Sequence, residues 1–217
     1  CPANIAISAS TPTISPPWLQ NTFVNPSDPH PLLHTMLTSE PELVSTIAPA
    51  PSTAGAIAPF FYYFAYGSCM CPVDLKRSLG ENTHPYVVGP ATLKGYRLGF
   101  HYYSAKRRCG ALDILPDAYS EVQGVLYRLP WHLSDRLDQR EGVQQNGYRH
   151  ESVAIACGTQ QYVGVRTYVV VKKTPTEIPP NDWYFNVVLR GAVTCQLPET
   201  YCWQLFDYMR GLQSACA

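Results

Sequence analysis

The pattern of apolar and polar positions divides the chain into two unequal parts near residue 60. Residues 1–59 show no regular hydrophobic period and contain eleven of the 20 prolines, three acidic residues and no lysine or arginine. Because proline lacks a backbone donor and disfavours both helix and sheet, we expect a proline-rich tail or linker of irregular structure. Apolar pieces at residues 32–37 and 43–47 could form helical turns that dock on a protein partner or on the rest of the chain.

From residue 60 to residue 217, aromatic and β-branched runs alternate with turn residues, and we interpret this part as one folded domain. Strands are predicted at residues 61–66, 86–93, 96–103, 111–115, 121–129, 148–156 and 162–171. Helices are predicted between Pro72 and Gly80, between Pro130 and Gly142, from the cap Asn181-Asp182 to Ala192, and from Pro198 to about Leu212. Many consecutive strands with few crossover helices favour an α+β fold, in which a small curved or barrel-like mixed β-sheet carries flanking helices.

Composition and charge exclude several classes of protein. Apolar residues make up 46% of the chain, which excludes complete disorder. The formal net charge is zero and no run of lysines and arginines is long enough to neutralise several phosphates, so we expect no nucleic-acid partner. The longest apolar stretch, residues 58–65, is far shorter than the ~18 residues of a membrane span, so we expect no membrane insertion.

The eight cysteines are spread over the chain without the compact spacing of a disulfide framework. Several lie inside apolar runs, as Cys157 and Cys202 do, where cysteine usually acts as a small core residue. We therefore expect mostly reduced thiols and a cytoplasmic protein. The sequence begins at Cys1 rather than at methionine, so we expect its first residue to result from processing or from division of a longer chain, with a lipid-modified cysteine as the alternative.

The first candidate for binding chemistry is the tripeptide Tyr66-Gly67-Ser68, between a predicted strand and a predicted helix. Glycine allows the backbone to approach a ligand closely, and amide N–H groups gather at such a turn. These donors could hold a carboxylate or a polarised carbonyl oxygen. Taken alone, the tripeptide is more typical of an ordinary strand-to-helix turn than of a binding site.

The second candidate is Glu141, which ends a predicted helix before Gly142. A carboxylate at this end faces the negative end of the helix dipole, and burial would further disfavour its charged form. Such a group suits a general acid/base near neutral pH, although Arg136 and Arg140 could act in the opposite direction. Taken alone, Glu141 is more typical of a solvated residue in a last helical turn than of a catalytic group.

Together these segments resemble the gamma-glutamyl cyclotransferase family in order and spacing. The resemblance extends from about residue 60 to residue 212 and does not include the tail. The segments that carry it are Phe64-Ala65-Tyr66-Gly67-Ser68, Gly110, Val122-Gln123-Gly124-Val125-Leu126-Tyr127, Leu137-Asp138, Glu141-Gly142, Tyr148, Val165-Arg166-Thr167-Tyr168, residues 180–192 and Leu197-Pro198-Glu199-Thr200-Tyr201.

The resemblance implies a curved mixed sheet with a cavity that binds a small gamma-glutamyl substrate. It also implies conversion of a gamma-glutamyl amide, amine or peptide into 5-oxoproline and a free amine, without a cofactor. Glu141 would transfer the proton, and the amides of Tyr66, Gly67 and Ser68 would hold the glutamyl group. Cys69 and Tyr148 complete the expected binding residues.

The chain departs from the family at Cys69, where the loop usually has asparagine. Backbone donors survive this change, but a cysteine near a helix N-terminus could have a lowered pKa. Two alternatives therefore remain: a hydrolase of gamma-glutamyl amides that uses Cys69, and a binding module without turnover. Cys69 and Cys71 lack a second pair that would complete a metal site, and we expect His101 and His150 to be ordinary strand residues.

Overall fold

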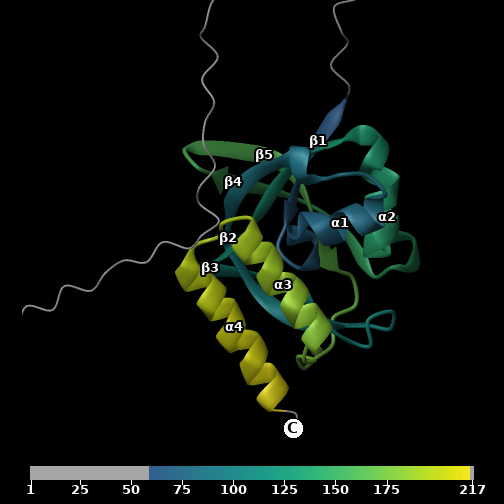
Figure 1. Cartoon of the computed structure of the whole chain (residues 1–217). Coiled ribbons are helices and arrows are strands. Elements are labelled where there is room, and N and C mark those ends of the chain that lie inside the picture. Colours follow the sequence, from purple (N-terminus) through teal and green to yellow (C-terminus); the bar gives the residue numbers. More distant parts are fainter. Residues whose placement is uncertain (1–58, 216–217) are drawn as a thin grey trace, which may run out of the picture. The chain divides into compact units, whose positions relative to one another are not determined.

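The computed structural model of the 217-residue chain describes residues 59–215. The predicted tail, with its apolar pieces at residues 32–37 and 43–47, lies outside the described residues except for Pro59. The described part contains five strands and four α-helices with short 3₁₀ turns between them (Figure 1). The strands are β1 (Phe60–Ala65), β2 (Val87–Ser104), β3 (Cys109–Pro130), β4 (Tyr148–Cys157) and β5 (Gln160–Val170), and the helices are α1 (Pro72–Leu79), α2 (Ser134–Glu141), α3 (Asp182–Thr194) and α4 (Glu199–Ser214).

The five strands form a closed barrel in the order β1-β3-β2-β4-β5, which confirms the predicted barrel-like mixed sheet with flanking helices. All neighbouring pairs are antiparallel except β1 and β5, which are parallel and pair at Tyr63 and Arg166. Two side-chain hydrogen bonds strengthen this closing pair: Thr167 Oγ1 donates to the carbonyl of Phe64 (3.0 Å), and Tyr66 Oη donates to the carbonyl of Tyr168 (2.6 Å).

Strands β2 and β3 form one long hairpin, whereas the sequence predicted two short strands on each side of its turn. The predicted breaks at Lys94-Gly95 and at residues 116–120 face each other across the ladder. Gly95 has φ +81°, and the register shifts there, from Lys94 opposite Glu121 to Tyr96 opposite Pro116. Turn-forming residues therefore produce a bulge that bends continuous strands instead of ending them.

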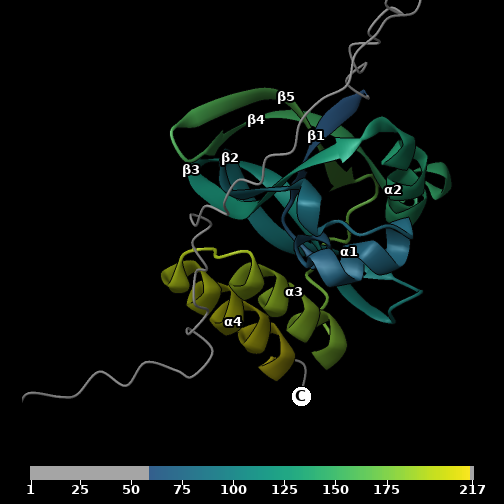
Figure 2. The same ribbon diagram turned by 45° about the horizontal axis from the view of Figure 1, so that its top comes forward.

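Helices α1 and α2 lie next to each other on one side of the barrel (Figures 1 and 2). Both end at a glycine in the left-handed conformation, Gly80 (φ +71°) and Gly142 (φ +66°), as predicted. The start predicted for α2 at Pro130 is wrong, because Pro130 ends β3 and a 3₁₀ turn at Trp131–Leu133 precedes the helix. Leu137 of α2 and Leu133 of the 3₁₀ turn are both buried in the core.

Helices α3 and α4 pack side by side on another part of the barrel (Figure 2). Asn181 caps α3 by accepting a hydrogen bond from the amide of Tyr184 (2.9 Å), as its sequence position predicted. Within residues 59–215, none of the helices is both long enough and apolar enough to cross a membrane.

Candidate active site

The six residues that the sequence singled out line a single cavity, and their roles in binding and catalysis stay predictions. They are Tyr66, Gly67, Ser68, Cys69, Glu141 and Tyr148. The cavity encloses about 30 Å³, and its other walls come from residues that were not predicted: Tyr63, Arg107, Ala111, Leu112, Tyr168 and Tyr184. The loop after β1 thereby faces the end of α2.

The loop after β1 lines this cavity and contains unpaired amide donors. Ser68–Met70 form a 3₁₀ turn in which the amide of Met70 donates to the carbonyl of Gly67 (2.9 Å). The amides of Gly67, Ser68 and Cys69 have no hydrogen-bond acceptor among residues 59–215. The first amides of a helical turn are free by geometry, so a ligand oxygen can accept from them.

Helix α3 supports this loop through a close approach at Gly191. A Cβ atom at position 191 would lie 2.7 Å from the amide nitrogen of Cys71 and 2.9 Å from the carbonyl carbon of Met70. Both contacts are to backbone, which cannot move aside as a side chain can. Glycine at this position therefore allows the helix to fix the loop that carries the free amides.

Replacing Gly191 with alanine should lower both the melting temperature and turnover, because the added methyl group pushes the loop away from α3. The expected loss is about 1–3 kcal/mol of unfolding free energy, the range for overpacking. Gly211→Ala in α4 is the matched control, since nothing lies within 4 Å of its Cβ position. That variant should gain up to about 1 kcal/mol from helix propensity, and equal effects of the two variants in thermal denaturation would contradict the expectation.

Glu141 brings a mostly buried carboxylate to the opposite wall. Its side chain is only 13% exposed, and its Oε1 accepts a hydrogen bond from the thiol of Cys69 at 2.9 Å. Three tyrosines surround the same space, and burial, reinforced by the nearby charge of Glu141, raises the pKa of Tyr63, Tyr66 and Tyr148. These phenols therefore stay protonated and can donate hydrogen bonds at neutral pH.

The tyrosine hydroxyls also fix the walls of the cavity. Tyr148 Oη donates to the carbonyl of Leu112 (2.8 Å), and the amide of Leu112 donates to Tyr184 Oη (3.0 Å). Arg107 lies over the ring of Tyr184, with 5.8 Å between the guanidinium carbon and the ring centroid. The turn between β2 and β3 thus brings a cation to the cavity.

Arg140 organises the polar groups behind the cavity, and the sequence did not predict this role. Its Nε donates to Cys69 Sγ (2.9 Å) and lies 3.7 Å from Glu141 Oε1, while its Nη2 lies 2.9 Å from Asp74 Oδ2. Nη2 also donates to Ser68 (3.2 Å). Burial opposes the charge on this guanidinium, yet the negative charges of its neighbours outweigh burial and raise its pKa, so Arg140 stays a cation.

The environment of Cys69 contradicts the predicted lowering of its thiol pKa. Burial is the largest effect and, with the charge of Glu141, it outweighs the attraction of Arg140, so the pKa rises to about 12. The thiol lies in a 3₁₀ turn rather than at the start of a regular helix, and it donates to a carboxylate, which stabilises the protonated form. Cys69 is therefore a neutral donor at neutral pH.

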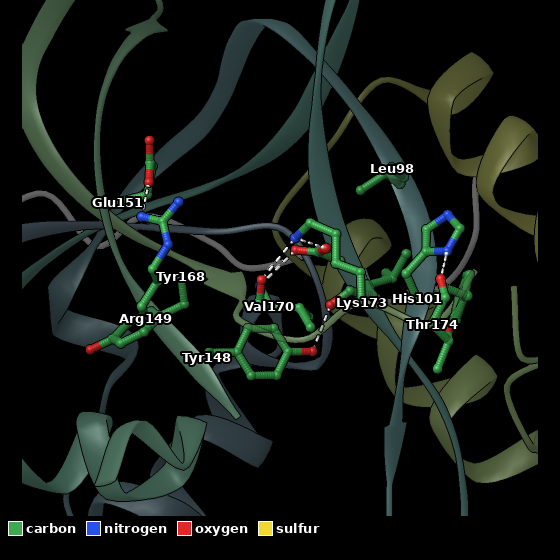
Figure 3. A network of polar contacts seen from close by, with 12 residues as sticks. Leu98, His101, Tyr148, Arg149, Glu151, Tyr168, Val170, Lys173 and Thr174 are labelled. Atoms are coloured by element: carbon green, nitrogen blue, oxygen red, sulfur yellow. Dashed lines mark hydrogen bonds and ion pairs between the residues drawn. The ribbon is translucent and has the colours of Figure 1, made fainter. Parts of the chain in front are cut away.

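The other predicted candidates lie outside the lining of this cavity. His101 Nδ1 is 2.9 Å from the carbonyl oxygen of Thr174 (Figure 3). His150 Nε2 is 2.7 Å from Asp138 Oδ1, which also accepts a hydrogen bond from Tyr168 Oη (2.5 Å). These contacts agree with the prediction that both histidines are strand residues. No group of three or more His, Cys, Asp and Glu within the described residues could hold a metal ion.

A second polar cluster lies outside the lining of the cavity and joins β3 to the end of β5. The carboxylate of Asp113 is fully buried, and it accepts hydrogen bonds from Lys173 Nζ (2.5 Å) and from the amide of Val170 (2.9 Å). Lys173 also donates to the carbonyl of Val170 at 2.8 Å (Figure 3). This pairing satisfies a charge inside the barrel.

Comparison with known proteins gives consistent results. Residues 121–205 match the AIG2-like family. YkqA of Bacillus subtilis, whose assignment as a gamma-glutamylcyclotransferase is itself provisional, is 37% identical over 139 residues, which are 64% of this chain and 48% of that protein. The mouse gamma-glutamylcyclotransferase is 26% identical over 152 residues, or 68% of this chain and 78% of that protein.

The fold agrees with the sequence comparison. The crystal structure of Bacillus subtilis YkqA superposes with a TM-score of 0.64 and 32% identity, over 70% of this chain and 54% of that chain. The resemblance to the gamma-glutamyl cyclotransferase family is confirmed. This chain spans about half the length of the Bacillus protein.

Two separate parts of the described chain meet at the cavity. Glu141 and Tyr148 lie within the AIG2-like match, whereas the loop from Tyr66 to Cys69 precedes it. Arg140 also lies inside the match, and its place directly before Glu141 was the one sequence signal for its role. Neither Asp74 nor Arg107 had such a signal, because they reach the site only through the fold.

Proposed function

We propose that this domain is a gamma-glutamyl cyclotransferase, which converts a gamma-glutamyl amide, amine or peptide into 5-oxoproline and a free amine. The observation that supports this proposal best is the position of the Glu141 carboxylate. It lies in one cavity with the loop whose three free amides can bind a carboxylate or a developing oxyanion.

In the proposed reaction, the substrate supplies its own nucleophile. Glu141 removes a proton from the α-amino group, which attacks the γ-carbonyl carbon and closes a five-membered ring. The amides of Gly67, Ser68 and Cys69 stabilise the negative charge that develops on the carbonyl oxygen. Glu141 then returns the proton to the departing amine as the carbon–nitrogen bond breaks, which completes a general acid/base cycle.

The reaction needs no cofactor as proposed, because nucleophile and electrophile belong to one molecule and proximity lowers the barrier. We also propose the cytoplasm as its location. Six cysteines of the described residues are free, which suits a reducing compartment.

The direct test is to incubate the full chain with a panel of gamma-glutamyl compounds and to measure 5-oxoproline by mass spectrometry. The panel should contain gamma-glutamyl amino acids, gamma-glutamyl amines and glutathione. Time-dependent formation of 5-oxoproline would support the proposal. Formation of free glutamate instead would favour the hydrolase, and saturable binding without either product would favour a binding module.

Replacing Cys69 with asparagine or alanine should preserve cyclisation, because the loop is expected to act through its backbone amides. We expect asparagine, the residue usual in the family, to retain turnover, and alanine to reduce it about tenfold or less, the cost of one or two hydrogen bonds. Steady-state assays of 5-oxoproline formation provide the measurement. Complete inactivation by alanine, together with a trapped thioester in the unmodified protein, would establish the hydrolase.

A further inference from the structure

A second and larger cavity, of about 660 Å³, adjoins the candidate active site, and we call it the basic groove. Its walls come from α1, from the turn between β2 and β3, from α2 and from the start of α3. Figure 1 shows α1 and α2 next to each other at this side of the domain. Six cations line the groove: Arg77, Lys106, Arg107, Arg108, Arg136 and Arg140.

The basic groove carries an excess of positive charge that the chain as a whole does not have. Its one acidic side chain is Asp74, which pairs with Arg140 at 2.9 Å. The five other cations form no ion pair with an Asp or Glu among residues 59–215. Because the formal net charge of the chain is zero, this is a local concentration, and a concave wall focuses its field on anions.

Two arginines connect the basic groove with the cavity around Glu141. Arg107 lines both. Arg140 lines the groove, and its Nε donates to the thiol of Cys69 inside the cavity. The two spaces therefore adjoin at Arg107, which places the groove next to a molecule whose reacting carbonyl lies beside Glu141.

We propose that the basic groove receives the amine portion of the substrate and selects amines that carry a phosphate or carboxylate group. This inference rests on the proposed cyclotransferase reaction. The glutamyl end has to lie beside Glu141, so the departing amine points out of the small cavity, toward Arg107. The volume of the groove falls within the usual range for ligand pockets, and Trp183, 47% exposed, adds a flat apolar wall.

Matched substrate pairs test this selectivity. Gamma-glutamyl-O-phosphoserine should have a kcat/KM about tenfold or more above that of gamma-glutamyl-serine, since several cations face the phosphate. Gamma-glutamyl-glutamate and gamma-glutamyl-glutamine form the second pair, which tests the carboxylate group because the two molecules differ by one charge. The ratio of their kcat/KM values should be smaller than in the phosphate pair. Both ratios should fall when salt rises from about 0.05 M to about 0.5 M, because the groove is open to solvent. Equal kcat/KM values in both pairs would overturn the proposal.

A variant of the basic groove tests the assignment of this selectivity to these residues. Arg77, Lys106 and Arg108 are exposed, so replacing all three with glutamine removes charge without disturbing the core. The ratio of kcat/KM for gamma-glutamyl-O-phosphoserine to that for gamma-glutamyl-serine should then fall below about threefold. Arg210→Gln, an exposed arginine of α4, is the matched control and should leave the ratio unchanged. A preference that persists in the triple variant would overturn the proposal.

Direct binding separates a failure of this inference from a failure of the proposed reaction. If no gamma-glutamyl compound yields 5-oxoproline, the cyclotransferase proposal fails. Titration calorimetry with O-phosphoserine then tests separately whether the basic groove binds anions. The full chain should bind O-phosphoserine at least about tenfold more tightly than serine, and the triple variant should lose this difference. Equal binding of the two compounds, or equal binding by wild type and variant, would overturn the anion site.

Discussion

Turnover of a gamma-glutamyl substrate should fall about 100- to 10,000-fold in Glu141→Gln, the range that a general acid/base contributes. Glutamine keeps the size of the side chain and the acceptor for the Cys69 thiol, but it cannot exchange the proton. We therefore expect kcat to fall with little change in KM or in melting temperature. Steady-state 5-oxoproline assays and thermal denaturation provide the two measurements.

Asp135→Asn is the control for this variant, because Asp135 is exposed on the same helix. It removes the same charge from α2 outside the cavity, and turnover should stay within about twofold, as for most surface substitutions. If Glu141→Gln formed 5-oxoproline at the wild-type rate, Glu141 would not be the acid/base. An equal loss in both variants would attribute the effect to the charge of the helix.

Replacing Arg140 with methionine should destabilise the domain by about 3–5 kcal/mol, the cost of removing one partner of a buried ion pair. The side chains of Arg140 and Asp74 are only 8% and 7% exposed, so the variant leaves a buried carboxylate without its cation. Ser68, Ser78 and Cys69 lose a donor in the same step. Urea denaturation of the full chain measures the loss.

A second substitution separates lost charge pairing from lost packing. Asp74→Asn in the Arg140→Met background removes the unpaired charge, so the double variant should be more stable than the single one. Lys76→Met, an exposed cation on α1, should change the stability by no more than about 0.5 kcal/mol. A double variant that is less stable than Arg140→Met would show that the ion pair does not explain the effect.

Local signals in the sequence predicted most element boundaries correctly. Pro72 with Gly80, and Asn181 before α3, define helix ends through contacts within a few residues, so their sequence positions were sufficient. Gly95 was misinterpreted because a turn glycine and a bulge glycine have the same local appearance. Only the pairing of β2 with β3 decides between them.

The sequence predicted those residues of the candidate site that belong to a local motif. It missed the residues that only the fold brings together. The loop at Tyr66 and the end of α2 at Glu141 were singled out from local sequence features, and the family resemblance connected them. The raised thiol pKa of Cys69 was not predicted, because it depends on burial and on a carboxylate 72 positions away. The basic groove was also not predicted, because its cations come from three segments that lie far apart in the sequence.

The closure of the barrel has a consequence for its motions. A single parallel pairing at Tyr63 and Arg166, with two side-chain hydrogen bonds, holds β1 to β5, whereas every residue of β1 is paired with β3. Opening along this seam thus breaks few bonds, and the same holds between β2 and β4, which pair only at Thr92 and Ala156. Tyr63, Tyr66 and Tyr168 lie at the seam and also line the cavity. Breathing of the seam would therefore widen a space of about 30 Å³ while the long β2–β3 hairpin keeps the barrel folded.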